Sequence, residues 1–145
     1  MSRPSWDELW MTFAVHLAER STCKRAQVGC VVVSGDNQRV LAVGYNGGPR
    51  GLWNDCLSDE PGKCGHLHSE VNALLKLNTQ DPARKVLYTS WMPCFNCAIA
   101  IVNADLDEVV YLNDYRSDDG VKLLGEAGID VRKYQGIVRL KEDRS

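Results

Sequence analysis

The sequence predicts an alternating α/β domain built on a mixed sheet of five strands. Short β-branched runs alternate with segments of helical periodicity along most of the 145 residues. The first two strands, 28–33 and 40–45, are separated by turn residues and predict an antiparallel hairpin. Each later strand follows a helix, which predicts parallel pairing through crossover connections.

The first helix is predicted after Pro4, with Ser5 as its cap and Glu8 completing a capping box. Apolar residues then recur at the three- and four-residue spacing of a buried helical face. That face consists of Trp6, Leu9, Trp10, Phe13, Ala14, Leu17 and Ala18. The sequence between 46 and 65 predicts a loop, and its length suggests that something holds it in place.

Three further helices and three further strands complete the expected order. The helices are predicted at 68–77, 94–104 and 118–127, and the strands at 85–90, 108–112 and 129–134. In the helix at 68–77 we expect Val71, Leu74 and Leu75 to point inward. We expect one domain over 1–145, with a charged tail after about residue 139.

Composition and charge narrow the possible functions. The formal net charge of −2 argues against a surface that neutralises many phosphates, although one mononucleotide needs only one or two cations. No apolar run reaches membrane-spanning length and no secretory signal is present, so we expect a cytoplasmic protein. Six cysteines in such a chain predict metal ligands and buried thiols rather than disulfides, and Cys30 is expected in the core.

Two short segments carry the predicted chemistry, His68-Ser69-Glu70 and the run from Pro93 to Cys97. His68, Cys94 and Cys97 supply one imidazole and two thiolates for zinc, which leaves a fourth tetrahedral position for water. The two cysteines share the first turn of a predicted helix, where the helix N-terminus favours thiolates. Glu70 is placed to move the proton of that water.

This arrangement predicts hydrolytic deamination, in which water adds to the amine-bearing ring carbon and ammonia leaves. Glu70 would pass the proton to the ring nitrogen and then to the leaving amine. The H-x-E and P-C-x-x-C pair is the signature of zinc-dependent nucleobase deaminases. The alternative is a closed structural zinc site with four protein ligands, and the carboxylate beside an open position favours catalysis.

A second group of metal-ligating residues remains once the first site is filled. Three thiols and one imidazole, from Cys23, Cys56, Cys64 and His66, form a donor set suited to a structural zinc. Such a site would fasten the long loop to the segment before the first strand. The alternative is that these are separate thiols and that His66 is an ordinary loop residue.

Four stretches of the chain resemble the deoxycytidylate (dCMP) deaminase family, within the cytidine deaminase fold. They occur in the family's order and span nearly the whole sequence. They are Ser21-Thr22-Cys23 with Gln27-Val28-Gly29, Gly44-Tyr45-Asn46-Gly47 with Pro49 and Gly51, His68 to Ala73, and Pro93-Cys94 with Cys97 followed by Val109-Val110-Tyr111. The zinc motif is shared across the superfamily, whereas the Gly-Tyr-Asn-Gly segment is similar to dCMP deaminases in particular.

The resemblance implies a three-layer α/β/α cytidine deaminase-like domain that converts dCMP and water to dUMP and ammonia for thymidylate synthesis. It also implies a homohexamer activated by dCTP and inhibited by dTTP, with magnesium accompanying the triphosphate. The implied effector site contains Gly44, Tyr45, Asn46 and Gly47, with Lys24, Arg25 and Arg50 as candidate triphosphate contacts. Turn-forming glycines and a solvated basic surface are the alternative interpretations of these residues.

Four residues are candidates for substrate binding. Asn46 is placed to bond a sugar hydroxyl or to cap its own turn. Tyr115 and Arg116 follow the fourth strand, where Tyr115 would wall the base and Arg116 would bind the 5′-phosphate, unless they are an exposed pair at a helix entry. Trp91 would stack on the substrate or simply pack.

Three positions depart from the family pattern. Ser69 stands where alanine is usual between the histidine and the glutamate, and Lys76 is the nearest candidate for an expected basic position beyond the Asn-Ala pair. The segment from Ser90 to Pro93 resembles polynucleotide cytidine deaminases. Alternatives are therefore a deaminase of nucleosides or single-stranded nucleic acid, which would need a basic channel, and a non-enzymatic zinc module, which would not need Glu70.

Overall fold

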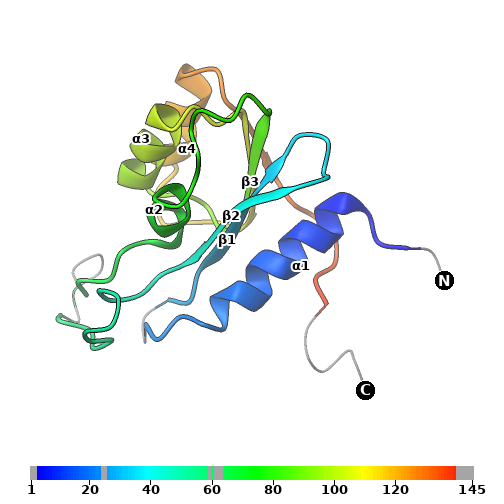
Figure 1. Cartoon of the computed structure of the whole chain (residues 1–145). Coiled ribbons are helices and arrows are strands. Elements are labelled where there is room, and N and C mark those ends of the chain that lie inside the picture. The colour runs from blue at the N-terminus through cyan, green and yellow to red at the C-terminus, as the bar shows by residue number, and fades with distance from the viewer. Residues whose placement is uncertain (1–2, 24–25, 59, 61–63, 140–145) are drawn as a thin grey trace.

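The computed structural model describes residues 3–23, 26–58, 60 and 64–139, and the expected charged tail after 139 lies outside them. Four helices and five strands alternate along the described chain (Figure 1). They are α1 (Trp6–Ala18), β1 (Gly29–Ser34), β2 (Val40–Tyr45), α2 (Ser69–Leu74), β3 (Lys85–Trp91), α3 (Phe95–Asn103), β4 (Glu108–Asn113), α4 (Asp119–Glu126) and β5 (Asp130–Lys133). The element order predicted from the sequence is confirmed.

The five strands form one mixed sheet in the order β2-β1-β3-β4-β5. Strand β1 pairs antiparallel with both β2 and β3, whereas β3, β4 and β5 are parallel to one another. The predicted hairpin and the predicted crossover pairing are both present. Because β3 and β4 are parallel, the segments that follow them leave the sheet at the same edge, where binding sites form in such sheets.

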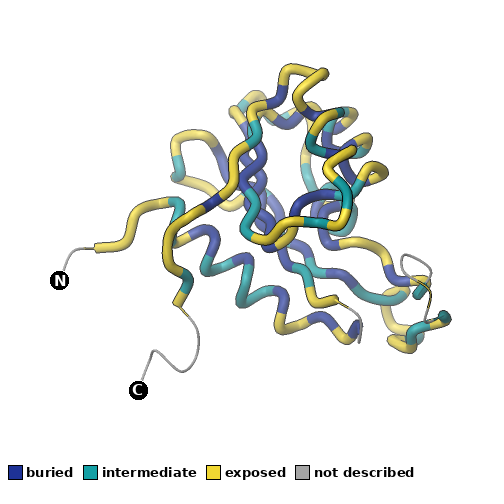
Figure 2. The backbone as a smooth tube through the Cα atoms, turned by 180° about the vertical axis from the view of Figure 1, so that it is seen from behind, coloured by how far each residue is buried: buried dark blue, intermediate teal, exposed yellow. Residues whose placement is uncertain are grey.

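The sheet lies between two helical layers, with α1 on one face and α2, α3 and α4 on the other (Figure 1). Alternating side chains of β1 serve the two layers: Cys30 and Val32 pack toward the three-helix face, and Val31 and Val33 toward α1. Buried positions concentrate on the central strands (Figure 2). Cys30 is in the core as predicted. In the part of the chain that is described, no helix has the length and apolar character to cross a membrane.

Helix α1 begins as predicted, because the Ser5 hydroxyl accepts a hydrogen bond from the backbone N–H of Glu8 at 3.1 Å. The Glu8 carboxylate pairs with Arg139 Nε at 3.1 Å. The predicted buried face was wrong at its start: Trp6 and Leu9 remain 48% and 42% exposed. The buried stripe begins at Trp10, whose indole N–H donates to Asn37 Oδ1 at 2.9 Å.

Helix α2 is shorter than the predicted 68–77. It ends at Leu74, and the next residues continue in tight turns, with the N–H of Lys76 bonding Ala73 O and that of Leu77 bonding Leu74 O. The inward placement of Leu75 was wrong, since this side chain is 73% exposed. Leu75 still makes an α-helical hydrogen bond to Val71 O, and two residues beyond Ala73 it lies on the opposite side of the helix from the buried Ser69, Glu70 and Ala73.

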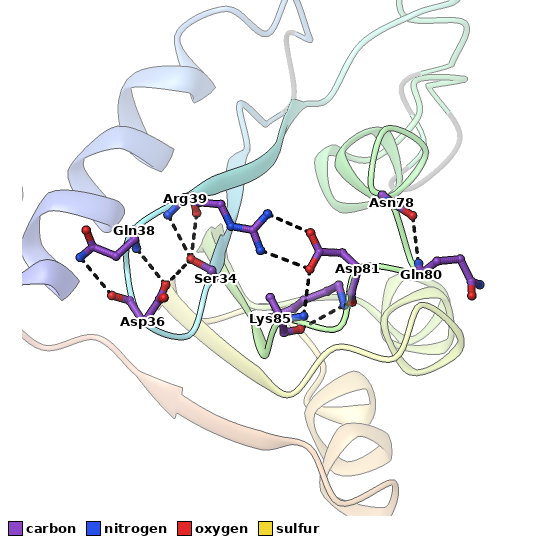
Figure 3. A network of polar contacts seen from close by, with 9 residues as sticks. Ser34, Asp36, Gln38, Arg39, Asn78, Gln80, Asp81 and Lys85 are labelled. Atoms are coloured by element: carbon purple, nitrogen blue, oxygen red, sulfur yellow. Dashed lines mark hydrogen bonds and ion pairs between the residues drawn. The ribbon is translucent and has the colours of Figure 1, made fainter.

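The β1–β2 turn is fastened to the loop before β3 by a polar network (Figure 3). Ser34 Oγ donates to Asp36 Oδ1 at 2.7 Å and accepts from the Arg39 N–H at 3.0 Å. The Arg39 guanidinium makes two hydrogen bonds to Asp81, at 2.9 and 3.2 Å. These contacts hold the hairpin end of the sheet, away from the segments that carry the metal-ligating residues.

Candidate metal centre and active site

The three predicted catalytic ligands converge, and we call His68, Cys94 and Cys97 the catalytic cluster. His68 Nδ1 lies 3.2 Å from Cys97 Sγ and 3.5 Å from Cys94 Sγ. His68 is the N-cap of α2 and Cys94 the N-cap of α3, so two helix starts are responsible for the arrangement. One nitrogen and two sulfurs at this spacing suit zinc with one position open.

The electrostatics of the catalytic cluster favour a thiolate. A hydrogen bond from the Cys97 thiol lowers the pKa of Cys94 to about 4, and the His68 imidazole contributes a further hydrogen bond. The same hydrogen bond, together with burial, raises the pKa of Cys97 well above its usual value. Cys94 therefore presents the charged form that binds a metal, and its position at a helix N-terminus adds to this effect.

Glu70 lies beside the catalytic cluster and is only 4% exposed. Burial raises the pKa of its carboxyl group, and a hydrogen bond from Ser69 Oγ to Glu70 Oε1, at 2.5 Å, acts in the opposite direction. A buried carboxylate whose pKa is raised suits a group that must accept and return a proton. Sequence reasoning noticed Ser69 as a departure from the family pattern but gave it no role.

A cavity of about 260 Å³ opens onto the catalytic cluster. Its lining includes the four residues predicted to bind substrate, Asn46, Trp91, Tyr115 and Arg116. Arg116 is the only lysine or arginine among the described lining residues, and its guanidinium carbon lies 5.0 Å from the centre of the Tyr115 ring. An anionic group of a ligand in this cavity would therefore be expected near Arg116.

Asn46 and Lys76 illustrate how local contacts constrain the candidate residues. The Asn46 amide bridges the segment before β1, accepting from Val28 N–H at 2.9 Å and donating to Ala26 O at 2.7 Å. Its role toward a sugar hydroxyl stays a prediction. Lys76 does not line the cavity and donates to Val43 O at 3.1 Å. Among the described residues Arg116, and not Lys76, is the cation that lines the cavity.

The second predicted metal-ligating group also comes together, and we call Cys23, Cys56, Cys64 and His66 the second cluster. The sulfurs of Cys23 and Cys56 and a ring nitrogen of His66 lie within 4.8 Å of one another. Cys64 adjoins them: burial raises the pKa of its thiol, and the neighbouring thiols of Cys23 and Cys56 raise it further. The structure thus brings three of the four predicted ligands, from two separate segments, within reach of one metal ion, and Cys64 lies beside them without joining that group.

The hydrogen bonds of His66 identify which of its nitrogens is available. Nε2 lies 3.0 Å from the carbonyl oxygens of both Asn54 and Asp55, so it must carry the proton and donate. Nδ1 then has an unshared lone pair, and it is the one buried side-chain nitrogen or oxygen of the described residues without a hydrogen-bond partner. A buried acceptor left unpaired is costly, and a metal ion would satisfy it.

The residues implied as an effector site occupy the end of β2 and the loop after it. A methyl group on Gly44 would lie 2.4 Å from Ser69 O, so this glycine allows α2 to approach the sheet. The guanidinium carbon of Arg20 lies 6.0 Å from the centre of the Tyr45 ring, a cation that sequence reasoning missed. Arg50 is exposed. Lys24 and Arg25 lie outside the described residues.

The sequence was compared with known protein families and with characterised relatives. Residues 4–113 match the family described as the cytidine and deoxycytidylate deaminase zinc-binding region. The deoxycytidylate deaminase of Saccharomyces cerevisiae is 39% identical over 147 residues, covering 92% of this chain and 46% of the yeast protein. That of Mycobacterium phage D29 is 36% identical over 126 residues, covering 77% of this chain and 97% of the phage protein. The chain spans about half the length of its yeast relatives.

A solved structure has the same fold. The dCMP deaminase of cyanophage S-TIM5, determined in complex with dCMP and dUMP, superposes with a TM-score of 0.79 at 33% identity. The match covers 92% of this chain and all of the phage chain. The sequence similarity, the fold similarity and the metal-ligand motif all point to the same family, over most of the described residues. The chain therefore belongs to the cytidine and deoxycytidylate deaminase family.

Proposed function

We propose that the protein catalyses zinc-dependent hydrolytic deamination of dCMP to dUMP and ammonia. The observation that carries this proposal is the convergence of three metal-ligating atoms and one buried carboxylate on a single cavity. Zinc held by the catalytic cluster would supply an activated water at neutral pH. Relatives named deoxycytidylate deaminase and the neighbour solved with dCMP and dUMP support the choice of substrate.

The protein's own residues account for the remaining steps. Trp91 and Tyr115 would enclose the base, and Arg116 would hold the 5′-phosphate. Glu70 takes one proton of the attacking water and delivers it to the ring nitrogen, and it then moves the second proton of that water, from the hydroxyl now on the ring carbon, to the departing amine, which leaves as ammonia. Glu70 is buried and lines the cavity, so the burial of its carboxylate limits competition from bulk water for these protons.

We extend the proposal to the second cluster, where a structural zinc would be held by Cys23, Cys56, Cys64 and His66. The unpaired Nδ1 of His66 and the convergence of Cys23, Cys56 and His66, with Cys64 beside them, support it. No disulfide joins the described cysteines, which agrees with thiols serving as ligands in a reducing compartment such as the cytoplasm.

Regulation belongs to the same proposal. We infer that dCTP with magnesium activates and dTTP inhibits a homohexamer, with effectors bound near Gly44 to Gly47. The resemblance of this segment to dCMP deaminases supports the inference. The guanidinium of Arg20 lies beside the Tyr45 ring and adds a positive charge next to this segment. Dependence of the sedimentation coefficient and of turnover on added dCTP and dTTP tests it.

The activity is tested by ammonia release from dCMP, deoxycytidine, dCTP and a cytosine-containing oligonucleotide, with Glu70→Gln as the control. Turnover of dCMP, reduced at least about a hundredfold in Glu70→Gln while zinc content is unchanged, is the expected result. Turnover of the oligonucleotide in preference to dCMP would instead indicate a nucleic-acid deaminase. Absence of turnover with every substrate would favour a zinc module without catalysis.

A further inference from the structure

The second cluster and the catalytic cluster border the same cavity. Cys23, Cys64 and His66 of the second cluster line it together with His68 and Cys94 of the catalytic cluster. A metal site with a purely local structural role needs no such proximity. Part of the wall that would surround the nucleotide is therefore made of residues whose positions depend on the second cluster.

A short extended segment connects the two clusters directly. Leu67 forms an isolated antiparallel bridge with Gly47, through hydrogen bonds of 3.2 Å from Gly47 N–H and 2.9 Å to Gly47 O. Alternate side chains of an extended segment point to the same side. His66 and His68 therefore both face the cavity, while Leu67 is 41% exposed on the other side.

Few other contacts hold this part of the wall. Between residues 53 and 66, the described part of the loop contributes one backbone hydrogen bond, from the Leu57 N–H to Cys64 O at 2.8 Å. His66 adds its two bonds to Asn54 O and Asp55 O and a stacked contact with Trp53. The Glu60 N–H also donates to Ser58 Oγ at 3.1 Å. A metal that cross-links Cys56 and His66 to Cys23 would add a connection from this loop to the segment before β1.

We propose that metal binding at the second cluster positions His68 and the cavity wall, so that the second site controls both retention of the catalytic metal and affinity for the nucleotide. A metal held by Cys23, Cys56, Cys64 and His66 fixes the His66 ring, and the bridged 66–68 segment passes that constraint to His68. The inference rests on the proposed second zinc site and extends it from local stability to control of the active site.

Cys56 offers a clean test because it is a member of the second cluster that does not line the cavity. Cys56→Ser removes a ligand without changing the surface that meets the nucleotide. Leu57→Ala is the matched control, since Leu57 neighbours Cys56 in the same loop, is exposed and offers no ligand. Cys56→His restores a metal-ligating side chain and tests rescue.

We would measure zinc per chain, the rate at which a chelator removes each zinc, and kcat and KM for dCMP. Wild type and Leu57→Ala are expected to hold two zinc ions per chain. Cys56→Ser is expected to hold one, to release it about tenfold faster and to show a KM for dCMP raised about tenfold, a loss of roughly 1.4 kcal/mol in binding. Cys56→His should recover both zinc content and KM.

The outcomes separate this inference from the proposals on which it rests. One zinc per chain in wild type would disprove the second site, and the coupling with it, while leaving dCMP turnover intact. One zinc in Cys56→Ser with wild-type release rate and wild-type KM would overturn the coupling alone. If Cys56→Ser does not fold, the chelation time course of wild type decides: coupled sites lose the catalytic zinc only after the second zinc has left, and independent sites lose them in either order.

Discussion

Among individual residues, Ser69 has the most specific relation to the proposed chemistry. Its hydroxyl donates to Oε1 of Glu70, whose carboxyl group also has a hydrogen bond with the Cys97 thiol. Ser69 is fully buried, so this hydrogen bond does not compete with solvent. A carboxylate oriented by a buried hydrogen bond is preorganised for proton transfer, and preorganisation of a catalytic group affects the rate of the chemical step more than binding.

Ser69→Ala is expected to lower kcat for dCMP about tenfold, because a hydrogen bond to a charged group contributes about 1.5–3 kcal/mol. KM should change by no more than about twofold, since Glu70 positioning matters mainly in the transition state. Steady-state kinetics measure both. Ser90→Ala is the control: Ser90 is equally buried, and its hydroxyl accepts from the Gly29 N–H rather than contacting Glu70. A raised KM with unchanged kcat would contradict the positioning role.

Replacing Arg116 tests whether the protein recognises a phosphate on its substrate. Arg116 is the lone lysine or arginine of the described cavity lining, so Arg116→Ala should raise KM for dCMP at least about tenfold, by loss of charge-assisted hydrogen bonds. Turnover of deoxycytidine, which has no phosphate, should stay within about twofold of wild type. Parallel kinetics on the two substrates check this. Equal losses on both would show that Arg116 supports the cavity rather than recognising the phosphate.

At the level of the elements, close helix packing explains a glycine that sequence reasoning placed in an effector site. An added Cβ at Gly44 would lie 2.4 Å from Ser69 O and 2.7 Å from Ala73 N, both backbone atoms of α2. The helix that carries Glu70 can therefore approach β2 only because position 44 lacks a side chain. This role is independent of any effector contact that the same residue makes.

Gly44→Ala should push α2 away from the sheet. Overpacking against backbone costs about 1–3 kcal/mol, so the melting temperature should fall by several degrees and kcat/KM for dCMP should fall as His68 and Glu70 move. Thermal unfolding and kinetics measure the two effects. Gly125→Ala in α4 is the control, because no described atom lies within 4 Å of its added Cβ. An active, stable Gly44→Ala protein would show that α2 can shift to accommodate a methyl group at position 44 without loss of function.

Elements with local signals were predictable, and those that depend on distant contacts were not. The order of helices and strands and the catalytic cluster follow from periodicity and from ligand spacing within one helical turn. The early end of α2, the exposed Leu75 and the exposed Trp6 depend on what the rest of the chain places beside them. The second cluster was predictable as a set of ligands, but its position on the catalytic cavity required the three-dimensional structure.

Across the whole molecule, a polar network joins the first helix to the last strand. Asp7 of α1 accepts hydrogen bonds from Arg132 of β5, at 2.6 and 2.9 Å, and from the Tyr88 hydroxyl of β3, at 2.5 Å. Arg132 also donates to Glu108 of β4 at 2.7 Å. No sequence pattern predicted this pairing, because Asp7 and Arg132 are 125 residues apart and neither belongs to a motif.

The network leads us to expect that the free energy of unfolding depends on the ionisation of Asp7. The Arg132 guanidinium holds the pKa of Asp7 below its usual value, against the opposing effect of burial. A carboxylate with a lowered folded-state pKa stabilises the fold above its unfolded pKa, about 3.9, and loses that contribution as the pH falls through the folded-state value. Asp7→Asn should therefore lower the free energy of unfolding at pH 7 by about 1 kcal/mol, since solvent screens the half-exposed Arg132.

Urea denaturation of wild type and Asp7→Asn at pH 7, 5 and 3 tests this prediction. The difference in unfolding free energy should be the same at pH 7 and 5, where Asp7 is ionised in both states, and should shrink at pH 3. Acid also protonates the metal-ligating thiolates and imidazoles, but this affects both proteins equally and cancels in the difference. A gap that stays constant down to pH 3 would mean that the charge of Asp7 is irrelevant. The gap would then come from the hydrogen bond between Arg132 and Oδ2 of Asp7, because the amide nitrogen that replaces this oxygen in asparagine cannot accept it.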